Sequence, residues 1–222
     1  YYREKTVSKT IFPNAWVLFV CDYGSSSVGI RHNDKIMFLD GPLAVFIPPF
    51  QIVQWHINPG WLQYRLYYCV REENTLPAIP HVFRIQAGQP FWSADTIQNW
   101  ISSEKSACPI SSASNISAVS RRIKAFIDEN YSKNLSIKFI MQCSQASSSY
   151  IVHTFLRDFG MTLTQYRHHL RMMNALHAIV VDRRDVTSSC FDAGFNNVSY
   201  FSRAFHDFIG SAPLRYRHKK RS

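Results

Sequence analysis

A short helix, a turn and a longer helix that ends in glycine occur twice in the second half of the sequence. The first copy runs from about Ile137 to Gly160, and the second from about Val186 to Gly210. In each copy, apolar residues recur at helical spacing, and the glycine that follows them is typical of a helix C-cap. Because such a unit must bury its apolar faces against neighbouring helices, the repeat predicts a helical domain with two helix-turn-helix shapes.

Two further helices are expected around the repeats. Ile123, Ile127 and Tyr131 are four residues apart and predict a helix over 120–131. Between the two copies we expect a longer helix over about 164–181, whose buried face would be Tyr166, Leu170, Met173, Leu176 and Val180. At 1.5 Å per residue this joining helix would be roughly 27 Å long. That length suits two recognition helices that enter major grooves about 34 Å apart.

The first hundred residues show a different pattern. Segments rich in Val, Ile, Phe, Tyr and Trp alternate with turns that contain Gly, Pro, Asn and Ser, and short strands of this kind favour a β-sandwich or barrel. One short helix is expected over 93–103, and the Ser-rich segment 102–116 is interpreted as a linker. The sequence therefore predicts an α+β protein with two domains, residues 1–101 and 117–222.

Positive charge is concentrated in the helical half. Residues 117–222 contain 16 Lys and Arg against 7 Asp and Glu, whereas residues 1–116 contain 9 against 8. The basic segment 215–222 adds to this imbalance at the C-terminal end. A nearly neutral domain joined to a strongly basic one is typical of a sensor or scaffold attached to a binder of polyanions.

The second helix of each copy is the candidate recognition helix. Its apolar residues form one face, and its polar and basic residues form another, which is what contact with base edges and phosphates requires. The alternative interpretation is an ordinary amphipathic helix on a basic protein. The candidate DNA-binding residues are Ser149, Val152, His153 and Arg157 in the first copy, and Asn197, Val198, Ser199, Ser202, Arg203 and His206 in the second. Leu156 is expected to be exposed beside the first set.

Other sequence signals bear on compartment and chemistry. No run approaches the roughly 18 apolar residues of a membrane span, and no secretory signal pattern is present, although the chain begins at Tyr1 without Met. Five scattered cysteines without a CxxC pair favour a reducing cytosol. No pairing of a nucleophile with a base and no phosphate-cradling loop stands out. We therefore expect a cytoplasmic protein that is neither an enzyme nor dependent on a cofactor, and that does not act at a membrane.

The C-terminal hundred residues resemble the AraC/XylS family, whose signature is GF, then SYFxRxF, then GxxP and YR. The residues that carry it are Gly194, Phe195, Ser199, Tyr200, Phe201, Arg203, Phe205, Gly210, Pro213, Tyr216 and Arg217. Upstream, Ser147, Ile151, Phe155, Gly160, Tyr166, Arg171 and Ala175 resemble the first motif and linker helix of the same family. The resemblance implies a bacterial transcription regulator, commonly an activator that contacts RNA polymerase, with tandem helix-turn-helix motifs on promoter DNA.

The sequence departs from the family pattern at two places. Ser189 and Cys190 stand where Ile-Ala is usual, which predicts looser packing of the first helix of the second motif. His153 stands where an Arg is common, which predicts weaker reading of a guanine edge by the first recognition helix. Arg203 is then the best candidate for a direct base or phosphate contact.

The N-terminal half resembles, more weakly, the cupin-like sensor domain of such regulators. The resemblance rests on residues 39–57, in which a strand, a glycine turn and a proline pair precede His56. Enzymatic cupins bind metal through clustered His and Glu, but His32, His56 and His81 are isolated in the sequence, so no metal site is predicted. The candidate effector-binding residues are Trp16, Phe38, Phe46, Trp55 and Tyr64, which could equally form the core of a small barrel.

Two other functions remain open at this point. One is a metal-dependent cupin enzyme with a helical accessory domain, and the other is a regulator that acts mainly through protein partners. The helix expected over 93–103 is short for a dimerisation segment, so a monomer and a homodimer are both compatible with the sequence. The promoter, the effector and the sign of regulation are not encoded in any recognisable pattern.

Overall fold

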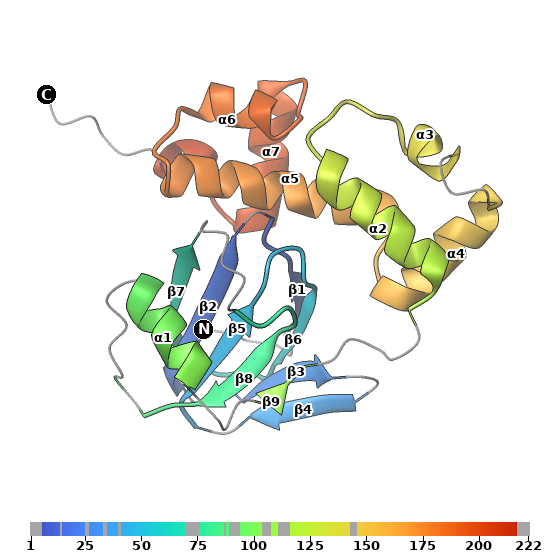
Figure 1. The fold of residues 1–222 in the computed structure, drawn as a ribbon. Coiled ribbons are helices and arrows are strands. Elements are labelled where there is room, and N and C mark those ends of the chain that lie inside the picture. The colour runs from blue at the N-terminus through green and yellow to red at the C-terminus, as the bar shows by residue number, and fades with distance from the viewer. Residues whose placement is uncertain are drawn as a thin grey trace, which may run out of the picture. The chain divides into compact units, whose positions relative to one another are not determined.

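The computed structural model describes residues 6–13, 15–24, 27–32, 35–39, 41–69, 76–86, 88, 94–103, 108–110, 116–142 and 146–216. The chain divides into two compact units, Tyr1–Ser114 and Asn115–Ser222 (Figure 1). Strands dominate the first unit and helices the second, which confirms the predicted α+β architecture. No helix in these ranges is both long and apolar enough to cross a bilayer.

The first unit contains two antiparallel sheets. The four-stranded sheet has the order β1 (Thr6–Thr10), β6 (Val53–Ile57), β3 (Val28–His32) and β4 (Lys35–Leu39). The five-stranded sheet has the order β7 (Leu62–Cys69), β2 (Trp16–Gly24), β5 (Leu43–Ile47), β8 (His81–Arg84) and β9 (Cys108–Pro109). The β-sheet unit expected from the short strands is therefore present, while its relation to a cupin-like barrel stays a prediction.

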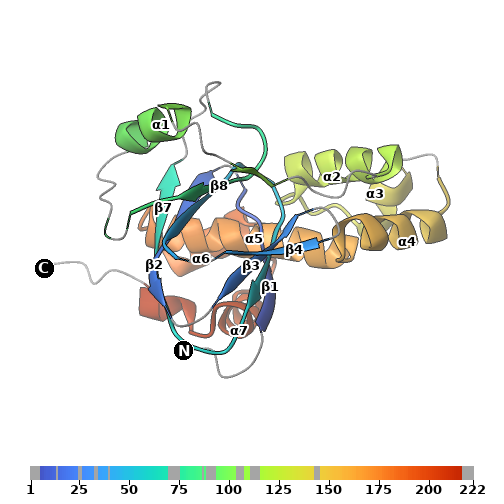
Figure 2. The ribbon, with the colours of Figure 1, turned by 90° about the horizontal axis from the view of Figure 1, so that it is seen from below.

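Helix α1 (Ala94–Ser103) covers one face of the five-stranded sheet and lies beside β7 and β8 in Figure 2. Its buried residues Ile97 and Ile101 pack in one cluster with side chains of β2, β5 and β8. The other face of β2 is turned toward the four-stranded sheet, because the ring of Phe19 lies 4.8 Å from that of Trp55. Successive side chains of β2 thus point into two different hydrophobic cores, one on each face of the sheet.

The predicted linker 102–116 differs from the structure along part of its length. Residues 102–103 end α1, and Cys108–Pro109 pair with β8 as an additional strand. Ile110 is buried and its N–H donates to the Pro80 carbonyl oxygen. These residues therefore belong to the first unit. Ser93, Cys143 and residues 217–222 of the basic segment lie outside the described ranges.

The second unit consists of six α-helices and a final short 3-10 helix among its described residues. They are α2 (Ala118–Asn130), α3 (Ile137–Gln142), α4 (Ser148–Phe159), α5 (Leu163–Val180), α6 (Val186–Asp192), α7 (Val198–Ile209) and the 3-10 helix η1 (Pro213–Tyr216). Each expected helix is present within a few residues of its predicted bounds. Cap residues fix where they begin and end, as in the capping box that Thr162 and Gln165 form at the start of α5.

The buried face of α5 differs from the prediction. Val180 was expected inside, but it is 37% exposed, whereas Met172 and Ile179 are fully buried. Met172, Ala175 and Ile179 pack against α6 and α7, so the apolar stripe is rotated toward the second motif near the end of the helix. Two adjacent apolar stripes run along α5, and periodicity alone cannot choose between them.

Candidate nucleic-acid interface

Two helix-turn-helix motifs are present, α3 with α4 and α6 with α7 (Figure 1). The second helices α4 and α7 each contain 12 residues. Ser147 and Asn197 are their N-caps, and Gly160 and Gly210 are C-caps in the left-handed conformation. The two helices therefore correspond position by position, with every residue of α7 numbered fifty above its equivalent in α4.

The inner side of α4 is formed by Ile151 and Phe155, which are buried. Its exposed side carries Ser149, Val152, His153 and Leu156, as predicted. Arg157 is also exposed, but its guanidinium pairs with Asp158 at 2.9 Å. Asp158 also accepts a hydrogen bond from the Ser117 N–H at 3.0 Å, which ties the end of α4 to the start of α2. The exposed centre of α4 thus carries two apolar side chains, Val152 and Leu156, beside His153.

The corresponding surface of α7 is polar and basic. Phe201 and Phe205 are fully buried, and Ser199, Arg203 and His206 are exposed on the opposite side, while Val198 and Ser202 are partly exposed. Among the described residues Arg203 has no ion-pair partner. His206 lies 3.6 Å from the Asp207 carboxylate. The guanidinium of Arg203 is therefore available to a base edge or a phosphate.

Asn197 has a structural role at the start of α7. Its side-chain oxygen accepts a hydrogen bond from the Tyr200 N–H at 2.8 Å, so this part of the amide holds the helix N-terminus. The residue is exposed. The sequence interpretation placed Asn197 only among the DNA contacts and missed the cap.

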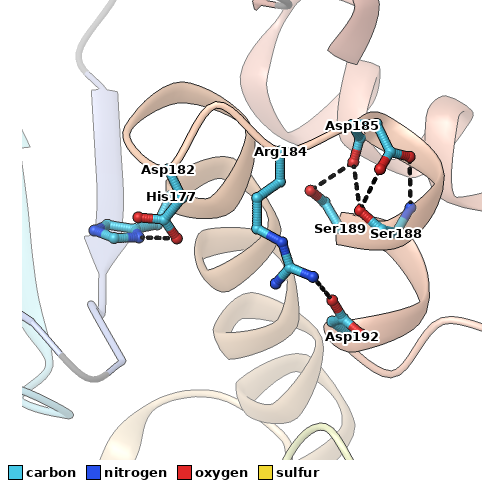
Figure 3. Close-up of polar contacts among 7 residues, drawn as sticks. All are labelled: His177, Asp182, Arg184, Asp185, Ser188, Ser189 and Asp192. Atoms are coloured by element: carbon cyan, nitrogen blue, oxygen red, sulfur yellow. Dashed lines mark hydrogen bonds and ion pairs between the residues drawn. The ribbon is translucent and has the colours of Figure 1, made fainter.

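The start of α6 is held by a compact polar network (Figure 3). Asp185 caps the helix: its carboxylate accepts hydrogen bonds from the N–H and hydroxyl of Ser188, at 2.9 and 2.6 Å. These bonds, above all the one from the Ser188 hydroxyl, hold the pKa of Asp185 below its usual value. Arg184 pairs with Asp192 at the other end of the same helix, and His177 lies 3.4 Å from Asp182. The turn between α5 and α6 is thereby fixed at several points.

The predicted loose packing of α6 is wrong. Ser189 is buried, and its hydroxyl donates to the Asp185 carbonyl oxygen at 2.8 Å. Cys190 is fully buried in the cluster that joins α5, α6 and α7. A buried hydroxyl with a backbone partner and a small apolar thiol both fit a tight helix contact. The residues that depart from the family pattern at these two positions are thus both buried, one with a hydrogen-bond partner and one within an apolar cluster.

The two motifs are joined by contacts that sequence reasoning missed. Arg171 of α5 donates to the carbonyl oxygens of Tyr131 and Lys133, at 2.6 and 2.9 Å, and its guanidinium lies 5.9 Å from the Phe195 ring centre. Arg167 donates to the Leu135 carbonyl oxygen in the same turn. Burial, with the nearby charge of Arg167, lowers the pKa of Arg171 to about 10. The sequence spacing of Arg167 and Arg171 does not predict these contacts, because their partners lie some thirty to forty positions away in the sequence.

In the first unit, a pocket of about 150 Å³ lies between the two sheets. Its wall includes Trp55 and Tyr64, two of the five predicted effector residues, on either side of Phe19. Trp16 and Phe46 are instead buried in the cluster beneath α1, and Phe38 is 45% exposed on β4. Strand alternation explains the difference, because residues of opposite parity on one strand face opposite sides of the sheet.

Two histidines of the first unit, His56 and His81, lie within hydrogen-bonding distance of groups of their own chain. His56 lies 3.1 Å from the Gln54 amide nitrogen, and His81 lies 2.8 Å from the Ile79 carbonyl oxygen. Within the ranges that the structure covers, no three or more His, Cys, Asp or Glu side chains are grouped as metal ligands.

Comparison with known proteins identifies the motif pair. A family model described as a helix-turn-helix domain matches residues 141–219. The uncharacterized HTH-type transcriptional regulator YijO of Escherichia coli K12 is 28% identical over 116 residues, which cover 51% of this chain and 40% of that protein. The melibiose operon regulatory protein of the same organism is 29% identical over 93 residues, or 41% of this chain and 30% of that protein. The chain therefore spans less than half the length of these curated relatives.

A solved structure is similar over both units. Apo ToxT of Vibrio cholerae matches with a TM-score of 0.59 at 12% identity, covering 97% of this chain and 93% of that chain. At this level of identity the similarity concerns the fold. It shows that the fold of this chain, a β-sheet unit followed by a helical unit, resembles that of a single-substitution variant of ToxT.

Proposed function

We propose that the chain is a bacterial transcription regulator that binds promoter DNA through its C-terminal unit, a helix-turn-helix domain of the AraC type. The observation that carries the proposal is the pair of equivalent helices α4 and α7, each with an exposed reading face and a buried apolar face. Their unit carries the excess of Lys and Arg. A basic surface supplies affinity for the phosphates, and the exposed faces supply contacts with bases.

The test begins with selection of bound duplexes from a random DNA pool. We expect a site with two half-sites about one helical turn apart, since each motif occupies one major groove. Affinity for the selected site should fall steeply as salt rises from about 50 to 200 mM, because binding releases counterions from the phosphates. Binding that selects no sequence, or that does not weaken with salt, would contradict the proposal.

Arg203 provides a sharper test of direct base contact. The variant Arg203→Ala should weaken binding to the selected site by about 1–3 kcal/mol while random DNA is affected much less. An equal loss on both kinds of DNA would assign Arg203 to a phosphate instead. Arg122→Ala is the matched control, because Arg122 is an exposed arginine on α2, outside both motifs.

The pocket between the sheets supports a role as effector site. Phe19, Trp55 and Tyr64 line it, with ring centres 4.8 and 5.2 Å from Phe19, and such a wall favours a small apolar or aromatic ligand. A ligand of this class should raise the melting temperature of the protein and quench tryptophan fluorescence. The variant Leu62→Trp, which would fill the pocket, should abolish both responses while leaving DNA affinity without ligand unchanged.

The remaining parts of the proposal concern partners and location. Activation would need a contact with RNA polymerase, and a homodimer would double the number of recognition helices on the promoter. Sedimentation of the protein alone and with its selected DNA would distinguish one chain per site from two. A regulator of bacterial promoters acts in the cytoplasm, where the chromosome lies. Transcription in vitro with purified polymerase would give the sign of regulation.

A further inference from the structure

The reading faces of α4 and α7 differ in chemistry at every central position. Because the two helices are equivalent residue by residue, Val152 corresponds to Ser202, His153 to Arg203 and Leu156 to His206. The exposed residues shared by the two helices lie in their first turn, where Ser149 corresponds to Ser199 and Tyr150 to Tyr200. The two recognition helices therefore cannot read the same sequence.

Val152 and Leu156 form an apolar ridge at the centre of the α4 face. They are one helical turn apart and are 36% and 42% exposed, while Ile151 and Phe155 fill the core behind them. Their side chains have no hydrogen-bonding groups, so they cannot pair with the polar edge of any base. In the major groove, the one apolar feature that distinguishes the bases is the C5 methyl group of thymine.

The charged neighbours do not change the character of this ridge. Arg157, at the end of the helix, is paired with Asp158. The position of His153, which is exposed beside Val152 on α4, is occupied on α7 by Arg203, whose guanidinium matches the O6 and N7 acceptors of guanine. The centre of the exposed face thus carries Val152 and Leu156 on α4, and Arg203 on α7. All three side chains are already exposed in the structure.

We propose that Val152 and Leu156 read thymine methyl groups, so that the DNA site has two unlike halves: a thymine-containing half under α4 and a guanine-containing half under α7. This inference rests on the proposed function, because it names what each helix recognises. It makes Val152 and Leu156 specificity-determining residues and gives the protein a defined direction on the duplex, since the two halves cannot be exchanged.

The experiment uses the full chain and its selected duplex. Thymines are replaced by deoxyuridine in one half-site at a time, which removes the methyl groups and leaves base pairing intact. In the half under α4 we expect a loss of about threefold to tenfold in affinity, since burial of one methyl group contributes about 0.8 kcal/mol. In the half under α7 the same replacement should change affinity less than twofold. There, 7-deazaguanine should weaken binding instead.

Variants assign the effect to the ridge. In Val152→Ala and Leu156→Ala the protein should bind the thymine and deoxyuridine duplexes with nearly equal affinity, because the contact is already lost. Val181→Ala is the matched control, since Val181 is an exposed apolar residue outside both motifs, and it should retain the full discrimination. Exposed positions such as these should tolerate alanine, and an unchanged melting temperature would show that the fold is retained.

Three results would overturn the inference. If deoxyuridine is neutral in both halves while sequence-specific binding persists, the ridge does not read methyl groups, and the proposed function stands with α4 available for a protein partner. If the discrimination survives in both alanine variants, other residues cause it. If no sequence is selected from the pool at all, the proposed function fails and the inference fails with it.

Discussion

Gly194 packs directly against the backbone of Ser132, and a Cβ atom built on this glycine would lie 2.1 Å from the Ser132 carbonyl oxygen. Gly194 follows α6 in the second motif, and Ser132 lies in the turn between α2 and α3 that precedes the first. The backbones of the two halves of the helical unit therefore touch. Only a residue without a side chain fits there, and its φ of +91° also favours glycine.

The variant Gly194→Ala should strongly destabilise the helical unit. A contact of 2.1 Å with backbone requires one of the two segments to move, in addition to the cost of a positive φ, so we expect a loss above about 2 kcal/mol in the free energy of unfolding. Urea denaturation followed by circular dichroism measures it. Gly210→Ala is the control: its φ is +86° but its Cβ would meet nothing within 4 Å, so a loss of only about 1 kcal/mol is expected.

Replacement of Arg171 should uncouple the two motifs. Its guanidinium bonds to two carbonyl oxygens beside the first motif and stacks near Phe195 of the second. Arg171→Ala should therefore weaken binding to a duplex with both half-sites more than binding to either half-site alone. Arg171→Lys should restore little, because a lysine lacks the planar fork that reaches both oxygens. Equal losses on all three duplexes would show that Arg171 does not hold the motifs in register.

Acidification should destabilise the helical unit through His169. Burial lowers the pKa of His169 to about 4, and its ring packs edge-on against Phe208 at 4.7 Å. The unfolded chain binds this proton below about pH 6.5, whereas the folded chain does not until about pH 4. Stability should therefore fall as the pH decreases from 6.5 to 4, by at most about 3 kcal/mol. In His169→Leu the fall should be smaller by that amount, and an unchanged pH profile would contradict the assignment.

Removal of one hydroxyl should be costly where α5 packs against α2. The Tyr166 hydroxyl is buried and donates to Asp128 at 2.5 Å, and Lys124 pairs with the other oxygen of that carboxylate at 2.6 Å. Tyr166→Phe should cost about 1–3 kcal/mol, because Asp128 then keeps a mostly buried carboxylate with one partner fewer. Tyr150→Phe is the control, since Tyr150 is exposed on α4 and should unfold as the wild type does.

Local patterns were sufficient for the helices of the second unit. Ser147, Gly160 and Gly210 mark helix ends through hydrogen bonds and backbone conformations that involve only adjacent residues, and the structure has these caps where the sequence predicts them. The exposed faces of α4 and α7 follow from the 3.6-residue period in the same way. The side of a helix that a residue faces depends only on its position among neighbouring residues. The candidate DNA contacts could therefore be named from the sequence, before the fold was known.

By itself, then, the sequence determined the two-unit architecture, the duplicated motif and the exposed residues of α4 and α7, because periodicity, caps and charge act over a few neighbouring positions. Tertiary structure alone decided which aromatic residues face the pocket, since Trp16 and Trp55 lie on strands whose two faces look alike in sequence. The tertiary structure also decided the contacts that Arg171 and Gly194 make with the turn around Ser132. That contact spans distant positions, and only the packing of α5 against both motifs brings them together.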